Sequence, residues 1–272
     1  MSITGMPRSR PGFASLVVAA LLCAATTAGA QAALGTAQSF GVLGASTVTN
    51  TGATTITGNL GVSPGTSITG DATITLVNGS EHVADGVAAQ ARADATTAYN
   101  MFAGLPFTTD LTGMDLGGMT LTPGVYFFES SAQLTGNLFL DFLGNANSVF
   151  VFRIGSTLTT ASASSVIEQN GGPGNGVYWD VGSSATLGTT TSFAGSILAQ
   201  QSITLTTGAT ILCGRAVALN GAVTMDNNVV STECLGAVTA TPEPATLVLL
   251  ATGLIGVFLM VTWRRTRPRM LA

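Results

Sequence analysis

The chain has 272 residues, 8% of them charged and 6% aromatic, and its formal net charge at neutral pH is −4. All of its basic residues are arginines, and only Arg92, Arg153 and Arg215 lie between residues 34 and 240, together with twelve acidic residues. This central region therefore carries a net charge of about −9, which excludes nucleic acids and anionic membrane surfaces as expected partners because like charges repel.

The N-terminus has the organisation of a secretory signal peptide. Arg8 and Arg10 precede an apolar stretch at residues 13–25, and small residues around Ala30 offer a cleavage site. We expect residues 1–32 to be this signal, and residues 33–240 to form one exported domain, which is long enough to enclose a single core.

The domain begins with short alternating runs that are rich in Thr and Gly. Thr51-Gly52-Ala53-Thr54 recurs letter for letter as Thr207-Gly208-Ala209-Thr210. From about Glu81 to Leu105 the pattern becomes helical, because apolar residues recur at spacings of four and three. The predicted buried stripe is Ala84, Ala88, Ala91, Ala95, Ala98 and Phe102. Ser80 and Glu81 are the expected cap, and Gly104 with Pro106 the expected stop.

Strands resume after residue 114 and lead into an imperfect repeat. Its units cover residues 149–169, 177–196, 197–214 and 215–231 and contain short alternating runs without helical spacing. A period near twenty residues of this kind predicts a β-solenoid, in which each unit is one coil that buries its apolar side only when its neighbours stack on it. The expected fold is mostly β, with one long helix packed alongside.

Alternation predicts which side chains point outward. In the run from Ser202 to Thr206, Ile203 and Leu205 share one side of the strand and the threonines share the other. The outward row predicted in this way is Thr186, Thr204, Thr206 and Thr224.

A second small-polar patch follows each run and is the surface that we select as the candidate binding site. Such patches should stack about 4.7 to 4.9 Å apart, coil upon coil. The candidate binding residues are Thr51, Thr54, Ser162, Ser164, Thr189, Thr191, Thr207 and Thr210. The corresponding patch in the last unit, Asp226-Asn227-Asn228, departs from the pattern.

Cys213 and Cys234 remain in the exported domain. An oxidising compartment permits a disulfide between them, although the sequence alone does not show whether their Cα atoms lie close enough.

The C-terminal segment, residues 241–272, contains Pro242-Glu243-Pro244, an apolar run from Ala245 to Trp263, and trailing arginines. The run is long enough to span a bilayer, and the arginines favour a cytoplasmic end. This tail resembles the PEP-CTERM sorting signal of Gram-negative bacteria. The resemblance implies recognition by an exosortase, an inner-membrane precursor, and a mature protein on the cell surface, in an exopolysaccharide matrix or released. The alternative is a plain C-terminal anchor.

Four further segments, residues 34–43, 58–65, 121–126 and 149–154, occur in the order seen in the microbial ice-binding protein family, which the domain resembles. The resemblance implies a discontinuous right-handed β-helix with a long helix beside it, and an ice crystal surface as partner. The family's Thr-Ala/Gly-X-Thr/Asn motif is matched by residues 51–54 and 207–210. We therefore expect an ice-binding protein that inhibits ice growth and recrystallisation through a flat face rich in Thr and Ser.

Two other classes of function, a surface adhesin or matrix solenoid and an enzyme, are less consistent with the sequence. A surface adhesin or matrix solenoid would suit the tail, but the aromatic residues that could stack on sugars, Tyr126, Tyr178 and Trp179, lie in alternating runs and are predicted to be core. An enzyme is not expected, since His82, Asp141 and Asp180 are isolated in the sequence and form no recognisable catalytic or metal-binding motif. We expect no cofactor and no bound metal.

Overall fold

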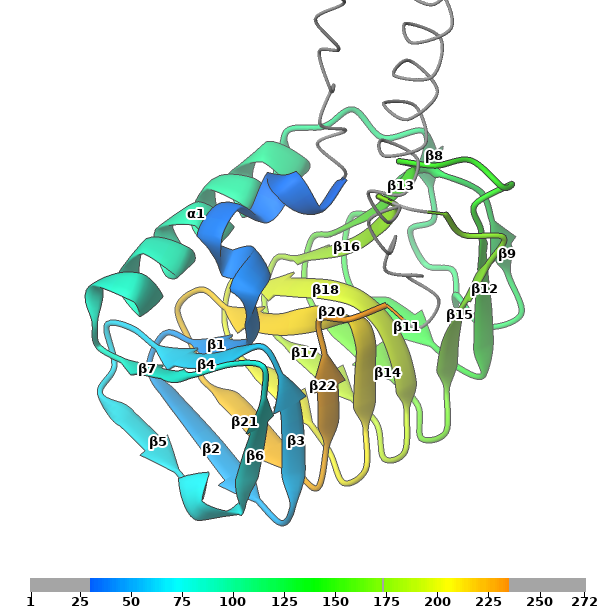
Figure 1. Ribbon diagram of the computed structural model, residues 1–272. Helices are drawn as coiled ribbons and strands as arrows, with labels where there is room; N and C mark the ends of the chain where they lie inside the picture. The colour runs from blue at the N-terminus through cyan, green and yellow to red at the C-terminus, as the bar shows by residue number, and fades with distance from the viewer. Residues whose placement is uncertain (1–29, 173, 235–272) are drawn as a thin grey trace, which may run out of the picture.

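The structure, a computed structural model, describes residues 30–172 and 174–234. The predicted sorting tail and all but the last three residues of the predicted signal peptide lie outside these ranges. Within them, no helix is both long and apolar enough to cross a membrane. The strands pair in parallel and wind into a three-sided solenoid with one long helix on one side, which confirms the predicted fold (Figure 1).

The chain begins with two coils and then a helix. These elements are η1 (Ala30–Ser39), β1 (Phe40–Gly44), β2 (Thr47–Thr51), β3 (Thr54–Thr57), β4 (Asn59–Val62), β5 (Ser67–Thr69), η2 (Asp71–Thr73), β6 (Ile74–Val77), β7 (Glu81–Val83) and α1 (Gly86–Ala103).

The remaining coils follow the helix. Their strands are β8 (Thr109–Asp110), β9 (Thr120–Leu121), β10 (Gly124–Phe128), β11 (Ala132–Leu134), β12 (Asn137–Asp141), β13 (Val149–Ile154), β14 (Leu158–Thr160), β15 (Ser165–Gln169), β16 (Gly176–Val181), β17 (Ala185–Leu187), β18 (Ser192–Ala199), β19 (Ile203–Leu205), β20 (Thr210–Ala218), β21 (Val223–Asp226) and β22 (Val229–Ser231).

The three sides of the solenoid differ in what covers them. A seven-stranded sheet, called the Thr sheet below, has the order β11-β14-β17-β19-β21-β2-β5. A fifteen-stranded sheet forms the other two sides, because the long strands β18 and β20 continue around a corner with a register shift between Ala194 and Ser196. One of these sides lies under α1 and is called the helix side. The other, which includes β3, β22, β15 and β12, is called the third side.

The solenoid is built from both ends of the domain, in agreement with the discontinuous β-helix that the family resemblance implies. The first coil does not start a separate stack: β1, β2 and β3 pair with β20, β21 and β22, the strands of the last coil. Strands β4, β5 and β6 then stack on the first coil. Helix α1 runs back along the helix side, where it contacts η1, β7, β4, β1, β16 and β13. The stack of coils is therefore continuous in space and interrupted in sequence.

The helix begins later than the sequence predicts. Glu81–Val83 form strand β7, which pairs with β4, and Ala84 is exposed with a left-handed backbone (φ +51°). The cap is Asp85, whose carboxylate accepts a hydrogen bond from the backbone N–H of Ala88 at 2.8 Å. The predicted cap at Ser80 and Glu81 and the predicted burial of Ala84 are thus wrong, because pairing with a distant strand overrides local periodicity.

The rest of the predicted stripe is confirmed. Its members Ala88, Ala91, Ala95, Ala98 and Phe102 are all buried against the helix side. The small side chains let the helix lie close to the sheet, and the ring of Phe102 stacks on Tyr178 with centroids 4.5 Å apart. The aromatic residues predicted as core, Tyr126, Tyr178 and Trp179, are buried as well.

Candidate functional site

One outward row of the Thr sheet is almost entirely threonine. Each strand of this sheet except β5 buries the residues on either side of one outward position: Ile203 and Leu205, for example, are at most 1% exposed and flank Thr204. Strand pairing places these outward positions side by side from coil to coil. The row, called the Thr ladder below, is Gln133, Thr159, Thr186, Thr204, Thr224, Thr49 and Thr69.

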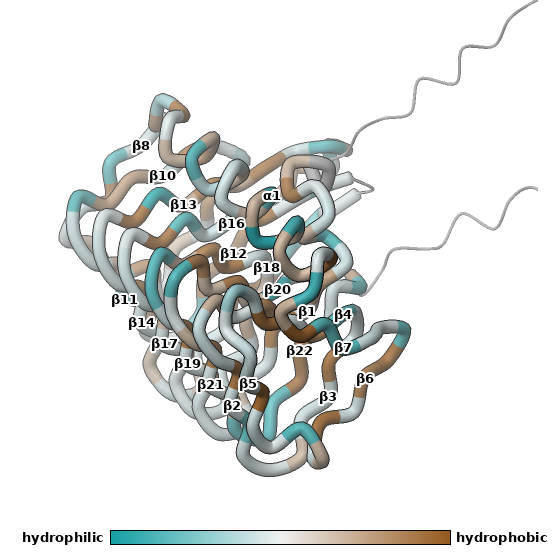
Figure 2. Tube along the Cα trace, turned by 90° about the vertical axis from the view of Figure 1, so that its left-hand side faces the viewer, coloured by the Kyte–Doolittle hydropathy of each residue, from teal (hydrophilic) through white to brown (hydrophobic). Residues whose placement is uncertain are grey.

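A second column of small side chains lies beside the ladder, two residues earlier in each coil. Its members are Ser131, Thr157, Ser184, Ser202, Ala222, Thr47 and Ser67. Hydroxyl groups meet between coils in both columns: Thr157 Oγ1 donates to Ser131 Oγ at 2.8 Å, and the hydroxyls of Thr49 and Thr69 lie 3.4 Å apart. Neither column contains a charged residue, and Figure 2 shows their strands as a regular stack.

The dimensions of this surface follow from strand spacing. Seven ladder positions at about 4.8 Å per coil span roughly 29 Å. The backbone beneath every position is held by parallel strand pairing, and the branched Thr side chain has few χ1 rotamers. The surface is therefore long, regular and rigid.

Charged residues mark the borders of the ladder. Asp115 is bridged to Gln133 beyond the first strand of the sheet. At the edge of the Thr sheet where the chain turns to the third side, Asp226 lies two residues after Thr224, and Asp71 lies two residues after Thr69. The Asp226 carboxylate accepts a hydrogen bond from the Thr207 hydroxyl at the turn of the preceding coil.

The residues that we selected from sequence lie in or next to the turns between the Thr sheet and the third side, and Thr51, Thr54 and Thr210 are the strand residues that border these turns. These turns, called the corner below, each contain a residue with left-handed backbone: Gly52, Ala163, Thr190, Gly208 and Asn227. At the corner, Thr51, Ser162, Thr189 and Thr207 are exposed. Thr210 lies beyond it, half-buried on the third side.

Three of the selected residues point into the protein. Thr54, Ser164 and Thr191 are at most 1% exposed. The Ser164 hydroxyl donates to the Leu134 carbonyl at 3.0 Å, and the Thr191 hydroxyl bonds that of Thr160 at 2.8 Å. Their hydroxyls satisfy polar groups inside the turns, so the prediction that they contact a ligand is wrong.

The repeated tetrapeptide does not mark equivalent positions. Thr210 lies opposite Val229, and Val229 lies opposite Thr55. Thr54 therefore corresponds to the buried residue before Thr210, because the tetrapeptide begins two residues after the ladder position Thr49 in the first coil but three residues after the ladder position Thr204 in the other. The same four letters place one threonine inside and the other on the surface.

Part of the Thr ladder lies in the predicted outward row, which we did not select as the binding site. Thr186, Thr204 and Thr224 belong to that row, whereas Thr206 lies two residues further and donates its hydroxyl to the Leu187 carbonyl at 2.8 Å. Gln133, Thr49, Thr69 and Thr159 were missed. The alternation Thr47-Val48-Thr49 contains the same signal in a shorter run.

The other two sides are less suited to a flat polar contact. The helix side is covered by α1. The third side mixes hydroxyls with exposed apolar residues, including Val229 at 40% and Val77 at 39% exposure.

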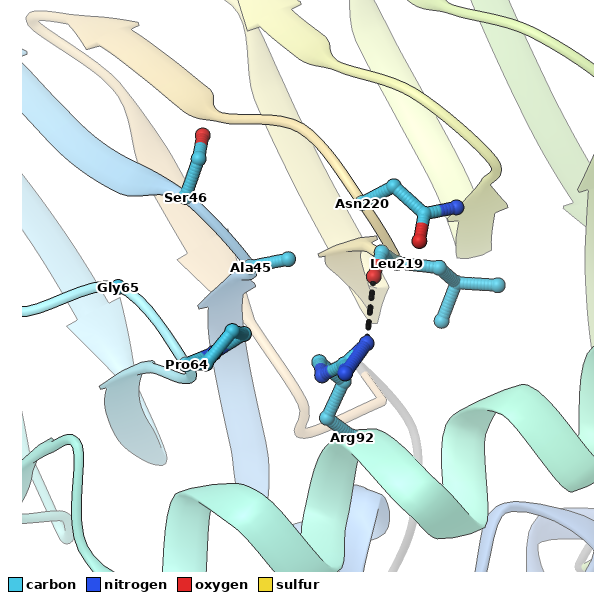
Figure 3. Close-up of a pocket in the computed structure, with 7 residues that line it drawn as sticks. All are labelled: Ala45, Ser46, Pro64, Gly65, Arg92, Leu219 and Asn220. Atoms are coloured by element: carbon cyan, nitrogen blue, oxygen red, sulfur yellow. Dashed lines mark hydrogen bonds between the residues drawn. The ribbon is translucent and has the colours of Figure 1, made fainter.

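A small pocket lies where α1 meets the turns of the N-terminal coils (Figure 3). It has a volume of about 390 Å³, and Arg92 reaches from α1 into it, donating a hydrogen bond to the Leu219 carbonyl at 3.0 Å. The guanidinium thereby ties the helix to the turn before β21. The other lining residues are Ala45, Ser46, Pro64, Gly65 and Asn220.

The ionisable residues considered as catalytic candidates are not brought together. His82 in β7 lies 2.8 Å from the Asp85 carboxylate, Asp141 is in β12, and Asp180 is buried in β16 beneath α1. Burial raises the pKa of Asp180 to about 7. In residues 30–172 and 174–234, no three His, Cys, Asp or Glu side chains are grouped so that they could hold a metal ion.

Comparisons with known proteins agree with this architecture. An ice-binding protein from Nostoc sp. (strain HG1) is 59% identical over 226 residues, which cover 82% of this chain and 83% of that protein. The crystal structure of an ice-binding protein from an Antarctic biological consortium has a TM-score of 0.69 at 48% identity, with 73% of this chain and 89% of that chain covered. The ice-binding protein of the Antarctic ascomycete Antarctomyces psychrotrophicus gives 0.68 at 43% identity, covering 74% of this chain and 98% of that one.

Family models match both parts of the chain. Residues 240–265 match the PEP-CTERM protein-sorting motif. Residues 42–231, which include every strand of the Thr sheet, match the family described as ice-binding-like. The chain therefore belongs to the ice-binding-like family and carries a PEP-CTERM sorting motif at its C-terminal end.

Proposed function

We propose that this protein binds the surface of ice crystals through the Thr sheet, and that it thereby inhibits ice growth and recrystallisation. The observation that carries the proposal is the Thr ladder, in which six threonines stand side by side on consecutive strands. Membership of the ice-binding-like family supports it.

The chemistry of the ladder suits a partner made only of ordered water. Ice presents no charge, so a binder gains from a surface that holds water in a regular arrangement over a large area. Each Thr offers a methyl and a hydroxyl at a fixed position. Because strand pairing already orders the backbone, little conformational entropy is lost on binding.

The absence of charged residues from the two columns also favours contact with ice. A charged side chain keeps a strongly bound hydration shell, and its removal from water costs far more than the removal of a hydroxyl. The domain carries twelve acidic residues between positions 34 and 240, yet they are excluded from both columns. The corner residues Thr51, Ser162, Thr189 and Thr207 lie along one edge and would extend the contact only at its rim.

The sorting motif implies an exported protein that an exosortase processes. We infer that residues 1–32 are removed on export, that residues 33–240 form the mature domain, and that an inner-membrane precursor delivers it to the cell surface, the exopolysaccharide matrix or the medium. Removing residues 247–272 should release the protein freely. If truncated and full-length proteins fractionate identically in the native host, the tail does not act as an anchor or sorting signal.

An adhesin that binds sugars finds less support. Tyr126, Tyr178 and Trp179 are buried and unavailable for stacking on a sugar ring, and the Thr sheet's two outward columns contain no aromatic residue.

The proposal is tested by ice-recrystallisation inhibition with purified protein covering residues 33–240, a range that contains every described strand. Native protein should keep ice crystals small during annealing, and heat-denatured protein should not. Equal crystal growth with native and denatured protein would contradict ice binding.

A further inference from the structure

The Thr ladder crosses a junction between the two ends of the domain. Strand β21 near the C-terminal end lies beside β2 near the N-terminal end, and Thr224 lies opposite Thr49. On the third side, β22 lies beside β3 in the same way. This junction between the last coil and the first coil is called the seam below.

The seam lacks the constraint that fixes register elsewhere. Successive coils of the main repeat are joined by a turn, so the chain itself limits how one strand can slide on the next. At the seam the paired residues are about 175 positions apart in the sequence. A slip by one residue would turn Thr49 inward. A slip by two would keep hydroxyls outside, because Thr47, Thr49 and Thr51 all point the same way.

The outward side chains therefore do not specify the register of the seam. The register must be specified by the side chains that point into the solenoid. The inward positions of β2 are Val48 and Asn50. Asn50 lies opposite Met225, whose neighbours in the preceding coils are Leu205 and Leu187. A buried amide, 6% exposed, thus stands at the end of an apolar column.

Asn50 is fully engaged with neighbouring groups. Its Nδ2 donates to the Gly52 carbonyl and to Thr73 Oγ1, both at 2.9 Å. Its Oδ1 accepts from the Thr54 hydroxyl at 2.6 Å. These bonds link β2 to the corner of its own coil and to η2 of the next coil.

A second buried amide continues the network across the seam. Thr54 Oγ1 accepts from the backbone N–H of Asn228 at 3.1 Å. Asn228, 1% exposed, donates through Nδ2 to the carbonyls of Thr206 and Ala209, both at 2.9 Å, in the preceding coil. One chain of hydrogen bonds therefore joins four consecutive coils, with the seam at its centre.

A buried polar network of this kind discriminates between registers. A buried polar group costs free energy unless its partners are in place. Asn50 holds the Thr54 hydroxyl on one side of the seam, and the Thr206 and Ala209 carbonyls hold Asn228 on the other. A slip at the seam would break the bond between the Asn228 N–H and Thr54 Oγ1, which is the bond of this network that crosses it. Single buried asparagines fix register in coiled coils in the same way, at some cost in stability.

We propose that Asn50, Thr54 and Asn228 are positioning residues that set the register of the seam and so keep Thr49 and Thr69 in line with the rest of the Thr ladder. Where it concerns ice, this inference rests on the proposed function. The register itself can be measured without ice.

The test uses cysteines at Thr49 and Thr224 as reporters. These outward residues, of which Thr224 is exposed and Thr49 half-buried, are paired across the seam, where strands lie about 4.8 Å apart, a Cα separation that permits a disulfide. The structure contains the disulfide between Cys213 and Cys234 that the sequence permitted. In the full domain carrying both Thr49→Cys and Thr224→Cys, mild oxidation should give nearly complete cross-linking, identified by peptide mass beside this native bond.

The test variant adds Asn50→Leu and Thr54→Val, which remove the network but keep the volume. If two registers become equally populated, the cross-linked fraction should fall to about half, and ice activity should fall with it. In the protein that keeps Asn50, Thr54→Ser retains the hydroxyl and should give wild-type cross-linking. If the double variant does not fold, Thr54→Val alone carries the same comparison.

A matched control removes a similar buried hydroxyl pair away from the seam. Thr160→Val with Thr191→Val deletes the 2.8 Å bond between coils that are joined by a turn. It should lower the melting temperature without changing the cross-linked fraction. Complete cross-linking in the seam variant, or an equal loss in the control, would overturn the proposal whether or not the protein binds ice.

Discussion

Replacement of Thr204 by tyrosine should remove most ice activity without unfolding the protein. Thr204 is the fourth of the seven ladder positions, between Thr186 and Thr224. Side chains stand roughly perpendicular to a sheet, so a tyrosine there should project roughly 4 Å beyond the neighbouring threonines. That gap exceeds the roughly 2.8 Å of one hydrogen bond to water.

The loss should extend beyond one position. A rigid crystal face held 4 Å off Thr204 also loses the neighbouring ladder positions, which lie about 4.8 Å away on either side. Thermal hysteresis should therefore fall several-fold. Thr204 is half-buried but points outward, and an outward strand position tolerates Tyr, so the free energy of unfolding should change by about 0.5 kcal/mol or less.

Thr207→Tyr is the matched control, because Thr207 is an exposed threonine at the corner. Its variant should keep most of the hysteresis. Hysteresis and melting temperature are measured for both proteins. A larger loss of hysteresis for Thr207→Tyr than for Thr204→Tyr, at equal melting temperature, would mean that the corner and not the Thr sheet contacts ice.

Three further predictions concern stability. Ala91→Asp with Ala95→Asp places charges at two positions that are 0% exposed on the buried face of α1, so the domain should unfold; an unshifted thermal melt would contradict the packing. Replacing Cys213 and Cys234 by serine opens a disulfide that spans 21 residues and should cost about 3 kcal/mol, or roughly 6 to 12 °C in melting temperature; a loss below 2 °C would show that the bond constrains little. Burial raises the pKa of Asp180 to about 7 in the folded protein, above the ordinary unfolded value of about 4, so its ionisation opposes folding and stability should fall as pH rises from about 4 to 7; Asp180→Asn should flatten this part of the melting-temperature profile, and an unchanged slope would refute the assignment.

Much of the fold could be predicted from local patterns. The spacing of Ala88, Ala91, Ala95, Ala98 and Phe102 predicts the buried stripe of α1 because helical periodicity is a property of the segment itself. Alternation around Ile203 and Leu205 likewise predicts the outward direction of Thr204. The start of the helix could not be predicted, since Glu81–Val83 pair with β4, a strand that lies about 20 residues earlier in the sequence.

The corner shows why the binding residues were harder to predict. Whether a threonine points outward depends on the parity of its position in the coil, and the repeated tetrapeptide starts two residues after Thr49 in one coil but three residues after Thr204 in the other. Ala163 and Thr190 adopt a left-handed backbone conformation that is uncommon for their residue types and could not be predicted from them. The alignment of Thr49 with Thr224 depends on a pairing between the two ends of the domain, which no local pattern contains.

Competitive partition into slowly growing ice tests the central claim most directly. Equal amounts of wild-type domain and of a variant carrying Thr186→Asp and Thr224→Asp are mixed, and the protein incorporated into the ice is compared with that left in the liquid. These ladder positions lie on either side of Thr204, and their carboxylates would hold hydration water against the crystal. If the Thr sheet binds ice, the wild-type domain should be enriched in the ice and the variant should remain in the liquid. Equal incorporation of both proteins, with both folded, would contradict ice binding through the Thr sheet.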